Sequence, residues 1–112
     1  MENVRNWFEN NSTNSGEHYS IFEYEGHLEA NTNIAIFMIV APHEGTKNKW
    51  MLRVSPSGSF DRWANSTAVE EFFNTDTELC SYLNDHQLEI YKALLVRLSR
   101  DYDELYTAFE ES

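Results

Sequence analysis

The chain is poor in several residue types, and each shortage excludes a class of protein. Cys80 is the only cysteine among 112 residues, so no internal disulfide can form and a reducing compartment is expected. The four glycines are isolated from one another, which excludes a glycine-rich phosphate-binding loop. The longest apolar run, residues 34–41, is too short for a membrane helix, which needs about 20 residues. Because the start of the chain also lacks the basic and then apolar pattern of a secretory signal, we expect one soluble, cytoplasmic domain, residues 1–112.

Basic residues are scarce as well, with eight lysines and arginines against 19 acids and a net charge of −11. Residues 1–46 carry seven acids and one base, and residues 63–112 carry eleven acids and three bases. Only the segment 47–62 reverses the sign. Such a field repels nucleic acid and anionic membranes and attracts basic protein surfaces over about 8 Å, the Debye length at physiological salt. The expected partner is therefore a basic protein surface, with no direct binding of nucleic acid or membrane.

The residue types that carry catalysis are present but not grouped. The histidines His18, His27, His43 and His86 never stand three or four residues apart, so we expect no metal site and no cofactor. Acids surround Cys80, which favours an inert thiol with a raised pKa. Neighbouring carboxylates can support glycosidase or metal-dependent phosphoryl chemistry, but such sites lie in the deep clefts of larger folds. The sequence therefore predicts that the protein is not an enzyme.

The first half of the chain predicts one helix and three strands. Val4, Trp7 and Phe8 are spaced as one apolar stripe of a short helix over residues 2–9, which the Asn- and Ser-rich residues 10–16 end. Strands are expected at residues 19–25, 33–41 and 49–55. The short turns between them allow only antiparallel pairing, so the strands should form a three-stranded meander.

The second half predicts helices. Two capping boxes, Thr67–Glu70 and Thr75–Glu78, indicate helix starts with a break near Asn74, and Asn84 is interpreted as the cap of a final helix. In that helix an apolar seam recurs at spacings of three and four: Leu88, Tyr91, Leu95, Leu98, Tyr102, Leu105 and Phe109. The expected fold is α+β, with an N-terminal helix, a three-stranded antiparallel sheet, and two to three C-terminal helices packed on the sheet. We expect the seam to cover the sheet, and the alternative is a homodimer in which it covers a second chain.

The carboxylates of the second half are the candidate partner-binding residues. They are Glu70, Glu71, Asp76, Glu78, Asp101, Asp103, Glu104, Glu110 and Glu111. On a helix, Asp101, Glu104 and the 110–111 pair would form one exposed strip opposite the seam, which could imitate a phosphate backbone with its charge every 1.7 Å or so. Aromatic residues in excess of one core, such as Trp7 and Trp50, could anchor the partner.

With Trp50-Met-Leu-Arg-Val54 as the third strand and Thr67-Ala-Val-Glu-Glu-Phe-Phe73 opening the helices, the chain resembles small phage-encoded anti-CRISPR proteins in element order, size and acidity. Some of these inhibit a CRISPR effector nuclease in the host cytosol by occupying its DNA-recognition cleft with carboxylates. The chain is also similar in size and acidity to the immunity proteins that neutralise bacterial nuclease toxins. Both resemblances imply a non-catalytic acidic inhibitor that mimics DNA and binds the basic site of a nucleic-acid-processing enzyme.

Two functions of other classes stay open. A small acidic dimeric chaperone or scaffold would use the apolar seam of the last helix as its dimer interface. A small enzyme would use one of the four histidines as its catalytic group.

Overall fold

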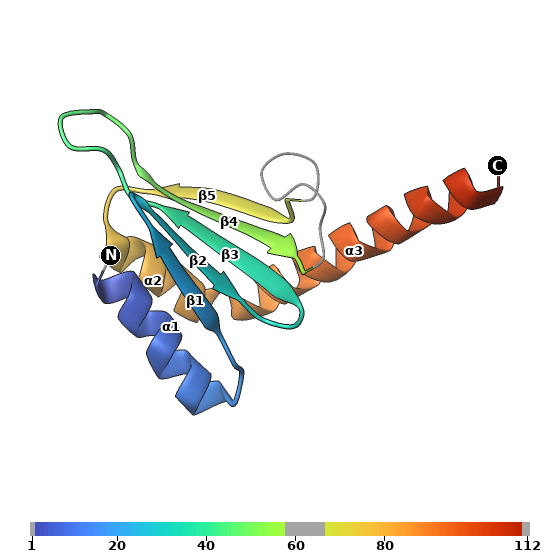
Figure 1. Ribbon diagram of the computed structural model, residues 1–112, viewed down its shortest axis with the longest axis horizontal. Coiled ribbons are helices and arrows are strands. Elements are labelled where there is room, and N and C mark those ends of the chain that lie inside the picture. Colours follow the sequence, from blue (N-terminus) through green and yellow to red (C-terminus); the bar gives the residue numbers. More distant parts are fainter. Residues whose placement is uncertain (1, 58–66, 111–112) are drawn as a thin grey trace.

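The computed structural model describes residues 2–57 and 67–110, with side chains to residue 99 (Figure 1). Helix α1 (Glu2–Ser15) precedes five strands, and helices α2 (Asp76–Asp85) and α3 (Gln87–Glu110) follow them. The strands are β1 (Ser20–Tyr24), β2 (His27–Asn31), β3 (Ala35–Val40), β4 (Trp50–Pro56) and β5 (Val69–Phe73). The α+β class, the N-terminal helix and the C-terminal helices are as the sequence predicted.

The sheet has five strands in the order β1-β2-β3-β4-β5, and every neighbouring pair is antiparallel. The expected meander is therefore confirmed, but the expected number of three strands is wrong. The sequence pattern does not predict strand β2, because its only apolar residues are Leu28 and Ala30, which give a weak alternation. It pairs with β1 through a two-residue turn in which Gly26 has a φ of 71°, a left-handed conformation that glycine adopts without steric cost.

Strand β5 replaces the helix that the Thr67–Glu70 capping box predicted. Val69 lies opposite Val54, and Glu70 lies opposite Arg53 of β4. The edge of β4 offers unpaired backbone groups, and Val69, Phe72 and Phe73 have high strand propensity. Pairing along that edge satisfies the backbone of the segment, so the tertiary context decides against the helix.

The core lies between one face of the sheet and the three helices, which all cover that face in Figure 1. The sheet supplies Leu28, Ala30, Ala35, Phe37, Ile39, Leu52 and Val54, and the helices supply Val4, Phe8, Leu79, Leu83, Ile90 and Leu94. Leu52 and Val54 point inward while Arg53 points to the other face, as the alternation along residues 49–55 predicted. Burial of this apolar surface, worth about 25 cal/mol per Å², is the main stabilising term.

Helix α1 continues to Ser15, six residues past its predicted end at Glu9. The polar side chains in this stretch bond back to carbonyls of the preceding turn: Ser12 Oγ donates to the Glu9 carbonyl at 3.0 Å, and Asn11 Nδ2 donates to the Trp7 carbonyl at 2.8 Å. These polar groups are thereby satisfied within the helix, which continues through residues that usually favour caps and turns. The helix stops at Gly16, whose φ of 74° is typical of a helix C-terminus.

Helix α2 begins where the second capping box predicted. Thr75 Oγ1 accepts a 3.1 Å hydrogen bond from the Glu78 amide, and the Glu78 carboxylate accepts one of 3.1 Å from the Asn74 amide. Asn84, in contrast, is not a cap. Helix α2 runs past it to Asp85, and the His86 amide closes the helix by donating to the Tyr82 carbonyl at 2.9 Å.

Helix α3 has 24 residues and extends well beyond the sheet (Figure 1). The expectation that its seam covers the sheet is wrong for three seam residues: Leu88, Leu95 and Leu98 are 64%, 67% and 52% exposed. Tyr91 of the same seam packs against the core, and the side chains of Tyr102, Leu105 and Phe109 lie outside the described residues. Ile90 and Leu94 are buried instead of the three leucines. The two stripes lie on adjacent faces of one helix, and the distances between elements, which the sequence pattern does not contain, decide which stripe meets the sheet. Among the described residues no helix is both long enough and apolar enough to cross a bilayer.

Candidate functional site

The two carboxylates predicted to open a helix, Glu70 and Glu71, lie instead on β5 and point to opposite faces of the sheet. Glu70 forms an ion pair with Arg53 and accepts a 2.9 Å hydrogen bond from its Nε. Glu71 lies opposite Leu52 and is exposed. The pairing with Arg53 neutralises Glu70, so the two residues do not form one anionic patch.

The first turn of α2 holds the next two predicted carboxylates, and both have structural partners. Asp76 Oδ2 accepts a 3.0 Å hydrogen bond from Asn3 Nδ2 of α1. Glu78 belongs to the capping box. Negative charge in the first turn of a helix stabilises it by about 0.3–1 kcal/mol. Asp76 and Glu78 therefore help to build α2 and tie it to α1.

The remaining predicted carboxylates are on the distal part of α3. The backbone places Asp101, Asp103, Glu104 and Glu110 on the segment of the helix beyond the sheet, and Glu111 lies outside the described residues. Figure 1 shows the start of α2 and the end of α3 at opposite ends of the molecule. The structure therefore divides the predicted acidic surface into separate groups on β5, α2 and α3.

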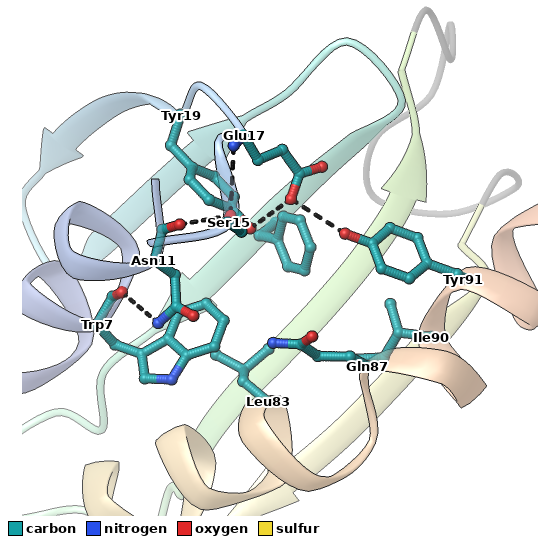
Figure 2. A pocket seen from close by; sticks show the side chains of 10 residues that line it. Trp7, Asn11, Ser15, Glu17, Tyr19, Leu83, Gln87, Ile90 and Tyr91 are labelled. Carbon is teal, nitrogen blue, oxygen red and sulfur yellow. Dashed lines mark hydrogen bonds between the residues drawn. The ribbon is translucent and has the colours of Figure 1, made fainter. Parts of the chain in front are cut away.

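A different group of residues lines a cavity of about 40 Å³ beside α1 and the start of α3 (Figure 2). They are Trp7, Asn11, Ser15, Glu17, Tyr19, Phe37, Leu83, Gln87, Ile90 and Tyr91. From the sequence, only Trp7 of this set was expected to contact a partner, as an aromatic anchor. No local signal points to the rest, because the lining residues come from four helices and strands and one connecting segment.

Glu17 is the acid of this cavity, and two phenols hold its carboxylate. Tyr19 and Tyr91 each donate a 3.0 Å hydrogen bond to the same oxygen, Oε2. The Glu17 amide also donates to Ser15 Oγ at 3.3 Å, which fixes the backbone at the end of α1. Figure 2 shows the carboxylate between the two tyrosines. One oxygen is therefore occupied, and Oε1 is left as an acceptor.

Burial and the negative charge of Glu17 keep both phenols protonated. Burial is the largest cause that raises the pKa of Tyr91 to about 12, and the hydrogen bond to Glu17 and its charge add to the shift. The pKa of Tyr19 is raised by burial and then by the same carboxylate. Both phenols therefore remain hydrogen-bond donors across the physiological pH range.

Trp7 forms one wall of the cavity and is fixed at both ends. Its indole Nε1 donates to Asn84 Oδ1 at 2.9 Å, and its carbonyl accepts from Asn11 Nδ2. The ring also meets Phe8 edge to face, with centroids 5.0 Å apart. Asn84, which the sequence suggested as a helix cap, thus positions this indole. The cavity has a rigid aromatic wall.

Neither a metal centre nor a reactive thiol emerges from the part of the chain that the structure describes. No group of three or more His, Cys, Asp or Glu residues there is arranged to hold a metal ion. The Cys80 thiol lies 3.8 Å from the Asn3 carbonyl. Burial raises the pKa of Cys80, and the charge of Asp76 raises it further. The direction agrees with the sequence prediction, but burial contributes more than the acidic surroundings on which that prediction was based.

Comparisons with protein-family models, with curated proteins and with solved structures find no match to this chain. The functional interpretation therefore depends on the charges, contacts and exposed surfaces of the chain itself.

Proposed function

We propose that this chain is a non-catalytic acidic protein that binds the basic site of a nucleic-acid-processing enzyme and inhibits it by mimicking DNA. The observation that carries the proposal is the excess of carboxylates over basic side chains. The net charge is −11, and residues 63–112 have eleven acids and three bases. Arg5 pairs with both Glu9 and Glu23, and Arg53 pairs with Glu70. Eight basic residues cannot neutralise 19 acids, so much of the anionic charge remains available to a partner.

The distal part of α3 is the element best placed to make this contact. It extends beyond the sheet (Figure 1) and carries Asp101, Asp103, Glu104 and Glu110. At 1.5 Å per residue the backbone from Asp101 to Glu110 spans about 14 Å, a length over which duplex DNA presents about eight phosphate charges. A protruding acidic helix can enter a cleft that is shaped for nucleic acid. Its long-range attraction would raise the association rate in a salt-dependent way.

The same proposal includes, as its alternative, an immunity protein that neutralises a bacterial nuclease toxin. The mechanism is identical, because such a toxin also presents a basic nucleic-acid site. The two differ in the enzyme that is bound, which identification of the partner decides.

The experiment is a capture from host lysate with the chain as bait, washed at low and at high salt, with the retained proteins identified by mass spectrometry. We expect a basic nucleic-acid enzyme that is displaced by DNA or RNA and weakened at high salt, and whose activity the chain inhibits. The triple variant Asp101→Lys, Asp103→Lys, Glu104→Lys should lose capture and inhibition with an unchanged circular dichroism spectrum.

The matched control reverses three exposed acids elsewhere, Glu2→Lys, Glu25→Lys and Glu44→Lys. It has the same net charge as the α3 variant and should retain inhibition. Equal loss in both triple variants would show that overall charge acts instead of the α3 site. Full inhibition by the α3 variant would contradict the assignment of the binding site to α3. Capture of only acidic or apolar proteins would contradict the proposed inhibitor function.

A second candidate function, a dimeric scaffold or chaperone, is favoured by the exposed seam of α3. Leu88, Leu95 and Leu98 are more than half exposed and follow the spacing of a coiled coil. The bases of this helix, Lys92, Arg97 and Arg100, all precede its distal acids. Antiparallel pairing of two copies would therefore bring basic segments next to acidic ones, whereas parallel pairing would bring acids together.

The solution mass separates this candidate from a monomeric inhibitor. A dimer that the double variant Leu95→Glu, Leu98→Glu converts to a monomer would support the scaffold. A matched variant, Phe22→Glu on the exposed far face of the sheet, should leave the dimer intact. A wild-type monomer over the micromolar concentration range would exclude the candidate.

A further inference from the structure

We propose that the cavity beside Glu17 binds a primary ammonium group, carried by a lysine side chain or by a small alkylamine. The cavity combines one carboxylate, aromatic walls and a rim that reaches solvent (Figure 2). Its Ser15 and Gln87 side chains are exposed, while Trp7, Tyr19 and Tyr91 are partly buried.

The charge of Glu17 calls for a cation. Its hydrogen-bond partners in the cavity are the two neutral phenols of Tyr19 and Tyr91, and it has no ion pair with any residue in the described part of the chain. Neither phenol carries a positive charge, so a cation that enters the cavity would be attracted to the carboxylate and an anion would be repelled.

A primary ammonium group has three N–H donors, and several side chains that line the cavity can accept hydrogen bonds. Glu17 Oε1 is left over after both phenols bond to Oε2. Asn11 Nδ2 donates to the Trp7 carbonyl, and the Oδ1 of the same side chain is left as an acceptor. The side-chain amide of Gln87 supplies a further oxygen from the start of α3. A quaternary ammonium has no N–H groups and would leave these acceptors without partners.

The aromatic walls favour the same ligand. Trp7, Tyr19 and Tyr91 line the cavity, and the faces of such rings attract cations through their quadrupole. The hydrogen bonds that hold Trp7 to Asn84 and the two phenols to Glu17 fix these walls before a ligand arrives. A preformed wall lowers the ordering cost of binding.

The cavity volume of about 40 Å³ limits what fits. Since one water molecule needs roughly 10–15 Å³ of such volume, the space holds about three non-hydrogen atoms. The end of a lysine side chain, an ammonium group with its neighbouring methylenes, has this size. A trimethylammonium head is bulkier and should bind more weakly.

The two sources of the ammonium group have different consequences. If the ammonium group belongs to a lysine, that lysine is part of the basic partner, so this alternative rests on the proposed function. The cavity would then act as a specificity pocket beside the charged surface. Binding of a free alkylamine is independent of the proposed function. The experiment therefore measures small probes first and the partner second.

The test is a nuclear magnetic resonance titration of the isotope-labelled full chain with Nα-acetyl-lysine methylamide, with its neutral norleucine counterpart and with n-butylamine. We expect shifts at the Trp7 indole N–H and the side-chain amides of Asn11 and Gln87. Affinity for the norleucine compound should be at least about tenfold lower, the loss expected when a charge-assisted hydrogen bond is removed. Tetramethylammonium should also bind more weakly than n-butylamine.

Glu17→Gln keeps the size of the side chain, removes its charge and should lower the affinity for both amines by at least about tenfold. Glu44→Gln makes the same charge change on an exposed loop and should leave the affinity unchanged. If Glu17→Gln alters the fold, Gln87→Leu at the exposed rim is the substitute. Equal affinity for the lysine and norleucine compounds, equal affinity of wild type and Glu17→Gln, or no shift with any probe would overturn the proposal.

The source is decided by which probe binds. Binding of n-butylamine without the lysine compound assigns the site to free amines. Binding of both, with capture of the partner weakened by Glu17→Gln, assigns it to a partner lysine. Failure of the proposed function has a separate signature, because the α3 triple variant would retain inhibition whatever the amine titration shows.

Discussion

The phenol of Tyr91 on α3 donates a 3.0 Å hydrogen bond to the carboxylate of Glu17, a residue 74 positions earlier in the chain. Tyr19 donates to the same oxygen. This shared acceptor joins the last helix to the segment that follows the first helix, and it closes one side of the cavity. Because both donors are phenols, the linkage depends on pH in the alkaline range.

Stability should therefore fall above pH 10 through these tyrosines. The pKa of Tyr91 rises from 10.0 to about 12 in the folded state. Below pH 10 the phenol is protonated in both states, so its contribution is fully present. Between pH 10 and 12 the unfolded chain loses the proton first, so the free energy of unfolding decreases as the pH rises. Denaturant unfolding across this range should show a shallower decrease for Tyr91→Phe than for the wild type.

The control for this prediction is Tyr24→Phe, which removes a phenol that is 60% exposed on the other face of the sheet. The free energy of unfolding of this variant should decrease with rising pH as steeply as that of the wild type. A slope for Tyr91→Phe identical to that of the wild type would contradict a role for the Glu17 linkage.

Phe8 should be among the side chains whose loss costs the most stability. It is fully buried, and its ring packs edge to face with those of Tyr19 and Phe37, with centroids 5.1 and 5.3 Å away. Phe8→Ala removes a core ring and leaves a cavity, so the free energy of unfolding should fall by about 3–5 kcal/mol. The matched change Phe22→Ala, at a side chain that is 47% exposed, should cost less than about 1 kcal/mol. Urea unfolding of the two variants measures the difference, and similar losses would contradict the assigned core.

The capping box of α2 should be measurable on its own. Thr75→Ala removes the oxygen that accepts from the Glu78 amide, so the free energy of unfolding should decrease by about 1 kcal/mol. Thr77→Ala, two residues later on the exposed surface of the same helix, removes a hydroxyl that caps nothing and should be neutral or slightly stabilising. Equal losses in the two variants would show that the cap contributes nothing specific.

Cys80 should react slowly with alkylating reagents at neutral pH. Burial and the nearby charge of Asp76 raise its thiol pKa, so little of the reactive thiolate is present. Asp76→Asn removes the contribution of the Asp76 charge to the raised thiol pKa and should speed alkylation of Cys80. Glu44→Gln, on a distant exposed loop, should leave the alkylation rate unchanged. Timed alkylation followed by mass spectrometry gives both rates, and a rate equal to that of the unfolded chain would show that the thiol is not protected.

Features that depend on neighbouring residues could be predicted from the sequence alone. The alternation of Leu52 and Val54 with Arg53 predicted a half-buried strand, and the Thr75 box predicted the start of α2, because a two-residue period and a cap are local properties. The apolar run around Phe37 likewise predicted the central strand. The excess of acids, and with it the expectation of a basic partner, follows from the composition.

Only the tertiary structure decided the remaining features, because each depends on groups that are distant in the chain. The edge of β4 turned residues 69–73 into a fifth strand, since it offered their backbone hydrogen-bond partners that no local pattern contains. The fit of α3 against the sheet buried Ile90 and Leu94 and left Leu95 exposed, although Leu95 belongs to the longer apolar seam in the sequence. The Glu17 cavity exists because folding brings α1 and α3 together around one carboxylate.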